Sequence, residues 1–183
     1  MTEDAAITGE LERLREQVTR LETMALRAWC AVTASLVCAG VLLPLGTEVR
    51  AVGDSGEEET RYLVLTTGFI FLEAARTGEG GDVALAALMA VGFLGLLLVA
   101  LGCLAGLVLM AQRSASQRAA TTFRVLMWLG LIGAGVTVIF SGLFVSAETA
   151  AGAGPGGLVL LAGMVAFALL LRPGARALWQ HGR

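Results

Sequence analysis

Few side chains in this sequence have the chemistry of a reactive or metal-binding centre, and their spacing does not bring them together. The cysteines Cys30, Cys38 and Cys103 all fall inside apolar runs and lack the CxxC or Cys/His spacing of a metal site. We therefore interpret them as small buried hydrophobic residues. The one histidine, His181, lies in the C-terminal tail, and the HExxH, GxSxG and P-loop signatures are absent from the sequence. The sequence thus predicts a protein that is not an enzyme, with no catalytic residue, no cofactor and no metal ligand.

A run of three carboxylates, Glu57–Glu59, is the one remaining cluster with binding chemistry. Such a run could attract a cation or a basic partner. The segment before it contains Gly53 and Gly56, and a flexible segment of this kind does not build the oxygen cage that calcium requires. We interpret the cluster as a solvated loop tip.

The composition of the chain indicates which class of protein carries these residues. Apolar residues make up 56% of the chain, and the mean hydropathy is +0.78. Soluble domains contain about 45–50% apolar residues. A chain with so few polar groups cannot cover a globule with them, so the sequence predicts an all-α integral membrane protein.

Four apolar segments are long enough, or nearly long enough, to cross a bilayer core that needs about 20 residues. The predicted spans are 28–46, 83–111, 123–146 and 157–172. The remaining segments are an N-terminal region 1–27, loops 47–82, 112–122 and 147–156, and a tail 173–183. Tyr62–Leu72 is also apolar, but it is too short to span. The expected fold is a four-transmembrane-helix bundle.

The arginines predict the orientation of these spans, because cytoplasmic flanks retain positive charge. All thirteen basic residues are arginine. Loop 112–122 and tail 173–183 carry arginines and no acid, and region 1–27 carries four arginines, with Arg27 next to the first span, whereas loop 47–82 has eight acids against three arginines. Both termini are therefore expected in the cytoplasm. Arginine without lysine, with abundant Ala, Gly, Leu and Val, is typical of a GC-rich bacterial genome such as that of an actinobacterium, which predicts a bacterial inner (cytoplasmic) membrane.

The extracytoplasmic loop 47–82 is expected to hold a small β-hairpin. Glu48–Val52 and Arg61–Leu72 are rich in β-branched and aromatic residues, and turn-forming residues lie between them. We expect Glu73–Arg76 to begin a short helix after the second strand.

The N-terminal region has the spacing of a coiled-coil helix. Apolar residues recur at alternating intervals of four and three, namely Ile7, Leu11, Leu14, Val18, Leu21, Ala25 and Ala28. The pattern predicts a cytoplasmic amphipathic helix that continues into the first span and pairs with a helix of a second copy or of another subunit. The alternative is an amphipathic helix that lies on the membrane or folds back on the bundle.

Small residues in the spans predict where helices pack, since helices in lipid associate through close approach. The second span has Gly102 and Gly106, and the fourth has Ala162 and Ala166. The third span offers the residues Gly130, Gly133, Thr137 and Ser141. These faces contact other spans of this chain or another subunit, and we favour contacts within the chain.

Taken as a whole, the sequence favours a non-enzymatic accessory subunit of a multiprotein complex in the bacterial inner membrane, namely a transport assembly with lipid as a candidate cargo. Its partners would be the lipid bilayer and other membrane subunits; a homo-oligomer stays open, and nucleic acid is not expected. One alternative is a self-assembling four-span channel or small transporter. It has less support because charged residues are missing from the middle of every span. Another is an envelope sensor that signals through the N-terminal helix.

Overall fold

The structure is a computed structural model, and it describes residues 2–51, 57–78, 81–112, 117–146 and 150–175. At residues 2–8, 48–51, 57–60, 81–82, 117–118, 143–146 and 150–152 the description covers the backbone only.

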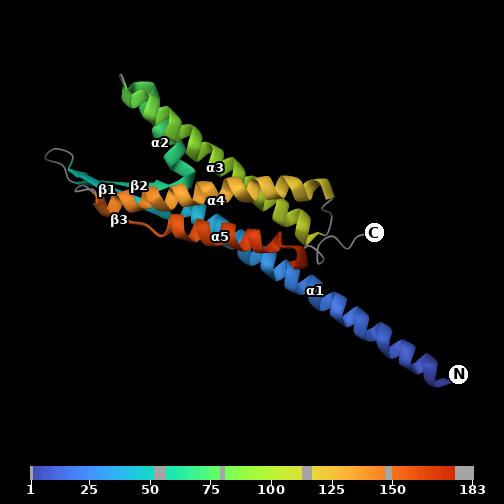
Figure 1. Cartoon of the computed structure of the whole chain (residues 1–183). Helices are drawn as coiled ribbons and strands as arrows, with labels where there is room; N and C mark the ends of the chain where they lie inside the picture. The colour runs from blue at the N-terminus through green and yellow to red at the C-terminus, as the bar shows by residue number, and fades with distance from the viewer. Residues whose placement is uncertain (1, 52–56, 79–80, 113–116, 147–149, 176–183) are drawn as a thin grey trace.

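Five helices and three short strands make up the described chain (Figure 1). The helices are α1 (Thr2–Leu42), α2 (Val64–Thr77), α3 (Gly81–Ala111), α4 (Gln117–Ser146) and α5 (Gly156–Leu170). The strands are β1 (Pro44–Ala51), β2 (Glu57–Leu63) and β3 (Ala150–Ala153). The N-terminal region and the first span form one unbroken helix, as the sequence predicts.

Helix α1 ends two residues before a proline. Its last residue is Leu42, and Pro44 disfavours the helical conformation for the residue before it. The predicted first span, 28–46, therefore extends too far, because Pro44–Gly46 belong to β1. Helix α4 begins at Gln117, before the predicted third span 123–146, so the end of the expected loop 112–122 is helical.

Four helices form a closed arrangement in which α1 packs against α5, α5 against α4, α4 against α3 and α3 against α1. The approach of α1 to α5 is close because both carry glycine at the contact. A Cβ on Gly40 would lie 2.5 Å from the Cα of Leu160, and one on Gly163 would lie 3.0 Å from the backbone nitrogen of Val37. Trp29 also donates a hydrogen bond from its indole nitrogen to the carbonyl of Ala166 at 3.3 Å.

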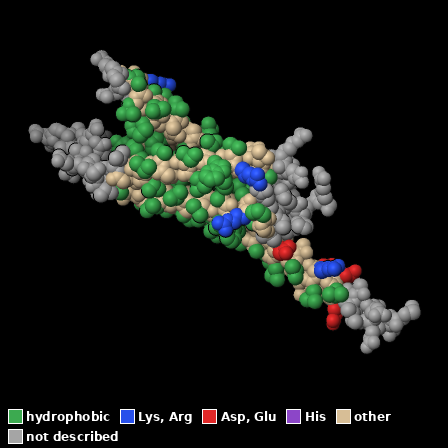
Figure 2. Space-filling view, viewed as in Figure 1, with side chains coloured by type: hydrophobic (Ala, Val, Ile, Leu, Met, Phe, Trp, Pro, Cys, Tyr) green, Lys and Arg blue, Asp and Glu red, His purple; other side chains and the backbone are tan. Residues whose placement is uncertain are grey.

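The outer surface of this arrangement is apolar (Figure 2). Leu98 and Ile139, for example, are each 69% exposed. Three helical segments, Gly9–Leu42, Val83–Ala111 and Ala119–Gly142, are long and apolar enough to cross a membrane, and Gly156–Leu170 is a shorter apolar helix. Large apolar side chains exposed over long helices are unfavourable in water and favourable in lipid. The chain thus has the features of a membrane protein, and its helices are compatible with a membrane helical bundle.

The strands form a small antiparallel sheet in the order β2-β1-β3, at the end of α1 farthest from the N-terminus (Figure 1). In the β1–β2 hairpin, Ala51 pairs with Glu57 and Thr47 pairs with Arg61. The hairpin expected in loop 47–82 is present, although β1 begins earlier than predicted. The third strand was not predicted; it lies in the expected loop 147–156, where Ala153 pairs with Gly46.

Helix α2 replaces most of the predicted second strand. We expected a strand over Arg61–Leu72, but the chain becomes helical at Val64, and the expected short helix from Glu73 is part of α2. The helix packs along α3, and Gly68 is close enough to Leu94 that a Cβ would lie 3.0 Å from that side chain. A helix satisfies its backbone hydrogen bonds internally, which an isolated strand beside apolar helices cannot do.

An aromatic cluster joins α2, α3 and α4 near the sheet. The ring centroids of Phe93 and Phe140 are 5.2 Å apart at an interplanar angle of 71°. Phe71 lies 6.1 Å from Phe140, and Tyr62 of β2 lies 6.4 Å from the same ring. Edge-to-face contacts of this kind stabilise packing by about 0.5–1.5 kcal/mol per pair beyond the area they bury.

Candidate interaction surface

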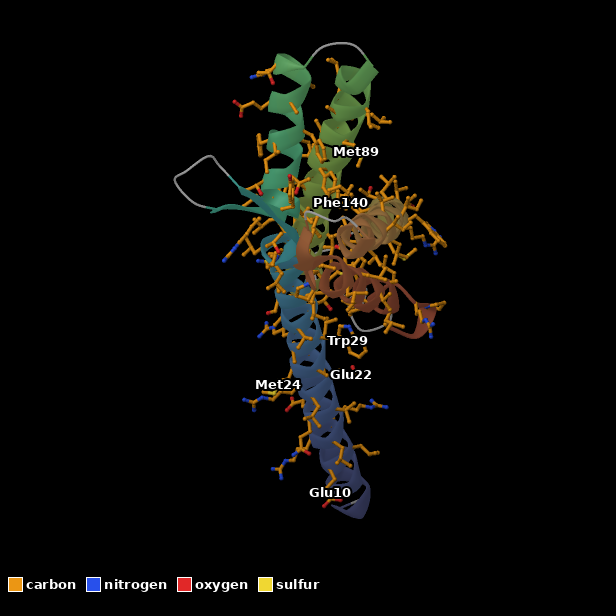
Figure 3. The ribbon with its side chains drawn as sticks, turned by 90° about the vertical axis from the view of Figure 1, so that its left-hand side faces the viewer. Glu10, Glu22, Met24, Trp29, Met89 and Phe140 are labelled. Atoms are coloured by element: carbon orange, nitrogen blue, oxygen red, sulfur yellow. The ribbon has the colours of Figure 1, made fainter. Side chains whose placement is uncertain are left out.

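The N-terminal half of α1 projects beyond the bundle as a single helix (Figure 1). We call residues 9–25 the arm. Its side chains are exposed except for the half-buried Thr23, and Leu26 is the first buried residue among the described side chains of α1. At 41 residues, α1 is about 60 Å long at 1.5 Å per residue, so the arm extends well past the other helices. Figure 3 shows the region around Glu10 and Glu22 with no other described element beside it.

The apolar residues with coiled-coil spacing lie exposed on this arm. Leu11, Leu14, Val18 and Leu21, which we call the seam, are between 52 and 66% exposed. The side chain of Ile7, the first residue of the predicted set, lies outside the described side chains. The described bundle therefore leaves the seam without an apolar neighbour.

The seam and the bundle-facing side of α1 point in different directions. The buried side comprises Leu26, Cys30, Thr33 and Val37. Because successive helical residues are about 100° apart, the centre of the seam is rotated by roughly 110° from the centre of this buried side. An unbroken α1 cannot turn the seam onto the bundle that its other half packs against.

The same spacing continues into the part of α1 that packs in the bundle. Beyond Ala25 and Ala28, the alternation of four and three reaches Val32, Ser35, Ala39 and Leu42. Of these six residues only Ala39 is partly buried, and the others are exposed. The predicted pattern ends at Ala28, although the spacing alone is sufficient to extend it to Leu42. Small residues along this outer side would let another helix approach α1 closely within lipid.

The predicted small-residue faces of the second and third spans lie between helices of this chain. Gly102 and Gly106 on α3 face Leu126 and Phe123 on α4, where added Cβ atoms would lie 3.1 and 2.9 Å from those side chains. On α4, a Cβ at Gly130 would lie 2.6 Å from the sulfur of Met164 on α5, and one at Gly133 would lie 2.5 Å from Leu96 on α3. These glycines sit at contacts inside the bundle.

Three hydroxyl-bearing residues of the spans, Thr33, Thr137 and Ser141, are buried between the helices. Thr137 donates to the carbonyl of Ala134 at 2.8 Å, and a Cβ on Gly157 of α5 would lie 3.0 Å from the Thr137 backbone. The hydroxyls of Thr33 and Ser141 have no hydrogen-bond partner among the described atoms. A hydroxyl in an apolar helix ordinarily bonds to a carbonyl of its own helix, as that of Thr137 does.

In the fourth span only one of the two expected small residues faces a neighbouring helix. Ala162 is exposed, whereas Ala166 is partly buried and its carbonyl accepts the hydrogen bond from Trp29 on α1. The close approaches are made by Gly157 and Gly163. Glycine is the stronger signal for close helix contact in lipid, and neither these two glycines in α5 nor Gly40 in α1 was among the predicted packing residues.

The residues with reactive side chains are dispersed. Cys30 and Cys103 are buried, as the sequence predicts, but the prediction is wrong for Cys38, which is exposed on α1. Among the described residues no three His, Cys, Asp or Glu side chains gather as a metal site would require. Glu57–Glu59 belong to β2 rather than to a loop tip, and their side chains, like His181, lie outside the described part.

The arm presents the apolar seam between polar side chains, and the seam has no partner in the described part of the chain. The helix that carries the seam is fixed to the bundle by its other half. The seam follows coiled-coil spacing, and the flanking Glu10, Arg15 and Glu22 carry charges of both signs, which select a partner and its register in coiled coils. Comparison with known proteins identifies no relative, since no family model, curated protein or solved structure matches the chain.

Proposed function

We propose that the chain is a non-enzymatic accessory subunit of a multiprotein assembly in a bacterial inner membrane, and that its arm docks it to a helix of another subunit. The assembly that we favour is a transport machine that handles lipid. The docking role is supported mainly by the exposed seam on the projecting half of α1.

Two other uses of an amphipathic helix fit this geometry less well. A helix that lies on the membrane surface has its axis in the plane of the interface. The arm is collinear with the spanning half of α1, so its axis points away from the membrane. A helix folded back on the bundle would bury its apolar side there, and Leu14 and Leu21 are more than half exposed.

The partner that this surface fits is a parallel or antiparallel helix with its own apolar heptads. Burying each half-exposed seam side chain would contribute about 1 kcal/mol. Val18 and Leu21 occupy successive core positions, and a β-branched residue followed by leucine is typical of two-stranded coiled coils. The exposed small residues Ala25 and Ala28 continue the seam side of α1 toward the membrane. A partner helix that also spans the membrane could therefore stay in contact with α1 beyond the arm.

Support for a lipid cargo comes from a cavity between α3 and α4. It has a volume of about 270 Å³ and is lined mainly by apolar residues, among them Met89, Phe93 and Val136. Thr137 is the one hydroxyl-bearing residue in its lining, and that hydroxyl already bonds to Ala134. An acyl chain is the ligand whose chemistry matches such walls.

The docking role is tested by the double variant L14N/L21N, with E12N/T19N as the matched control. The control residues are also seven positions apart and exposed, but they lie off the seam. We expect tagged wild-type and control chains, purified in mild detergent from native membranes, to bring the same partner subunits. The double variant should insert normally and lose most of that recovery, because two core positions become polar.

Unchanged recovery of partners with L14N/L21N would contradict docking through the seam. Recovery of the wild-type chain alone, as a defined homo-oligomer, would favour the self-assembling channel or transporter. That alternative has less support because Thr33, Thr137 and Ser141, hydroxyl-bearing residues of the described spans, are buried between helices. The sensor alternative would instead require segment 53–59, and replacing it with a neutral linker should abolish signalling.

A further inference from the structure

A groove with two arginines lies between α4 and α5, at the end of the bundle where α4 begins and α5 ends. Its volume is about 300 Å³, and its lining comprises Arg124, Met127, Trp128, Ala168, Leu171, Arg172 and Pro173. Both arginines are exposed, and both side chains border this one space. Figure 2 shows two basic patches near one end of the apolar bundle surface.

The sequence supplies no carboxylate to neutralise these arginines locally. Segments 112–128 and 172–183 together contain six arginines and no Asp or Glu. Neither Arg124 nor Arg172 makes a salt bridge with another described residue. A space bordered by two guanidinium groups that have no carboxylate partner in the described part of the chain attracts an anion, and the planar guanidinium matches phosphate oxygens in a bidentate manner.

The rest of the groove is apolar, and apolar walls do not contribute to the binding of a free anion. The side chains of Met127, Trp128 and Leu171 form its walls. From there toward the middle of the helices, the outer surface is covered by exposed apolar side chains, including Ile132 on α4 and Val165 on α5. The arginines therefore lie where an apolar surface meets a polar one, and tryptophan is typical of that boundary.

We propose that this groove binds the phosphate headgroup of an anionic phospholipid, with Arg124 and Arg172 holding the phosphate and the acyl chains lying over Ile132 and Val165. Basic pockets between membrane helices are suited to such headgroups. The ligand has to combine a negative charge with an apolar extension, because the groove offers both kinds of wall. This site is distinct from the seam and does not depend on the docking role.

The preference for anionic over zwitterionic lipid is the quantity to measure. An arginine near a membrane surface favours an anionic lipid by about fivefold, so two arginines acting on one phosphate give a preference of about 30-fold. Native mass spectrometry of the full chain, purified in detergent and mixed with phosphatidylglycerol and phosphatidylcholine, reports this preference as the ratio of bound lipids.

The test compares R124Q/R172Q with R20Q/R27Q. Both pairs remove two exposed arginines and change the net charge equally, but Arg20 and Arg27 lie on α1 outside the groove. We expect R124Q/R172Q to lose the preference for phosphatidylglycerol and R20Q/R27Q to keep it. The variant R124K/R172K should retain most of it, since lysine also binds phosphate as a point charge.

Two results would overturn the proposal. One is an equal loss of preference in both glutamine pairs, which would indicate a general effect of net charge. The other is complete displacement of phosphatidylglycerol by millimolar inorganic phosphate, which would assign the site to a free anion. Retention of the lipid in the presence of phosphate supports the lipid, because the apolar walls contribute to its binding.

Discussion

At the scale of single residues, glycine determines how closely the helices approach. Gly40 allows α1 to pass α5 with backbone against backbone, and Gly163 does the same one turn further along α5. Other glycines face open space; a Cβ on Gly95, for example, would have no neighbour within 4 Å. The same residue type is therefore essential at one position and replaceable at another.

The substitution Gly40→Ala should destabilise the bundle strongly. The new Cβ would lie 2.5 Å from both the Cα and the nitrogen of Leu160, so backbone has to move. We expect a loss of about 3 kcal/mol, the upper end for overpacking, which corresponds to a drop in melting temperature of about 6–12 °C. Thermal unfolding of the purified chain in detergent measures this shift.

Gly95→Ala is the matched control, because it adds the same methyl group where space is available. Its effect should be neutral, or stabilising by less than about 1 kcal/mol, since alanine favours the helix. Equal melting temperatures for the two variants would contradict the close contact of α1 with α5.

At the scale of elements, the sequence predicted the long helices well and the outer segment poorly. Length and hydropathy were sufficient for α3 and α4, because lipid requires a long run of apolar residues. The segment Val64–Leu72 was assigned to a strand because it is rich in Val, Thr, Phe and Ile. Its buried residues, Val64, Thr67 and Gly68, together with Phe71, follow helical spacing, and that periodicity was the better signal.

The length of α5 makes the number of crossings a testable property. Its 15 residues extend about 22 Å, which is shorter than a hydrocarbon core of about 30 Å. The arginines favour a crossing nevertheless, because Arg172 and Arg176 would otherwise lie on the same side as the acidic loop 47–82. The flanking Gly154 and Arg172 would then lie at the two interfaces.

We expect reporter fusions to place both termini in the cytoplasm. Green fluorescent protein fused at either end should fluoresce, and alkaline phosphatase fused at the C-terminus should be inactive. An active C-terminal phosphatase together with a cytoplasmic N-terminus would mean three crossings, with α5 lying at the outer interface.

At the scale of the whole molecule, the arm is continuous with the bundle through α1 but packs little against the other described helices. Deletion of residues 2–22 should lower the melting temperature by less than about 2 °C, because the exposed arm contributes little packing to the bundle. The same deletion should abolish recovery of partner subunits. Circular dichroism during heating and affinity purification from native membranes measure the two effects.

A large loss of stability on deletion would mean that the arm supports the bundle, which would contradict its role as a free docking surface. Loss of membrane insertion is not expected, because Arg27 and the apolar half of α1 remain in the shortened chain.

The two candidate surfaces differ in how far the sequence predicts them. The seam is local, since every residue that forms it lies on one helix and its spacing can be read directly. The groove depends on Arg124 and Arg172, which are 48 positions apart and adjoin one space only because α4 packs against α5. Each arginine alone was accounted for by membrane orientation, so tertiary structure was needed to bring them together.

The continuity of α1 restricts how the length of the arm can change during evolution. Each residue inserted between Leu21 and Leu26 would turn the seam by about 100° relative to the bundle, whereas seven residues would turn it by only about 20° from its original direction. A lineage that keeps the same partner can therefore gain or lose whole heptads in this segment, while single-residue insertions would be selected against even though they leave the arm helical and the bundle intact.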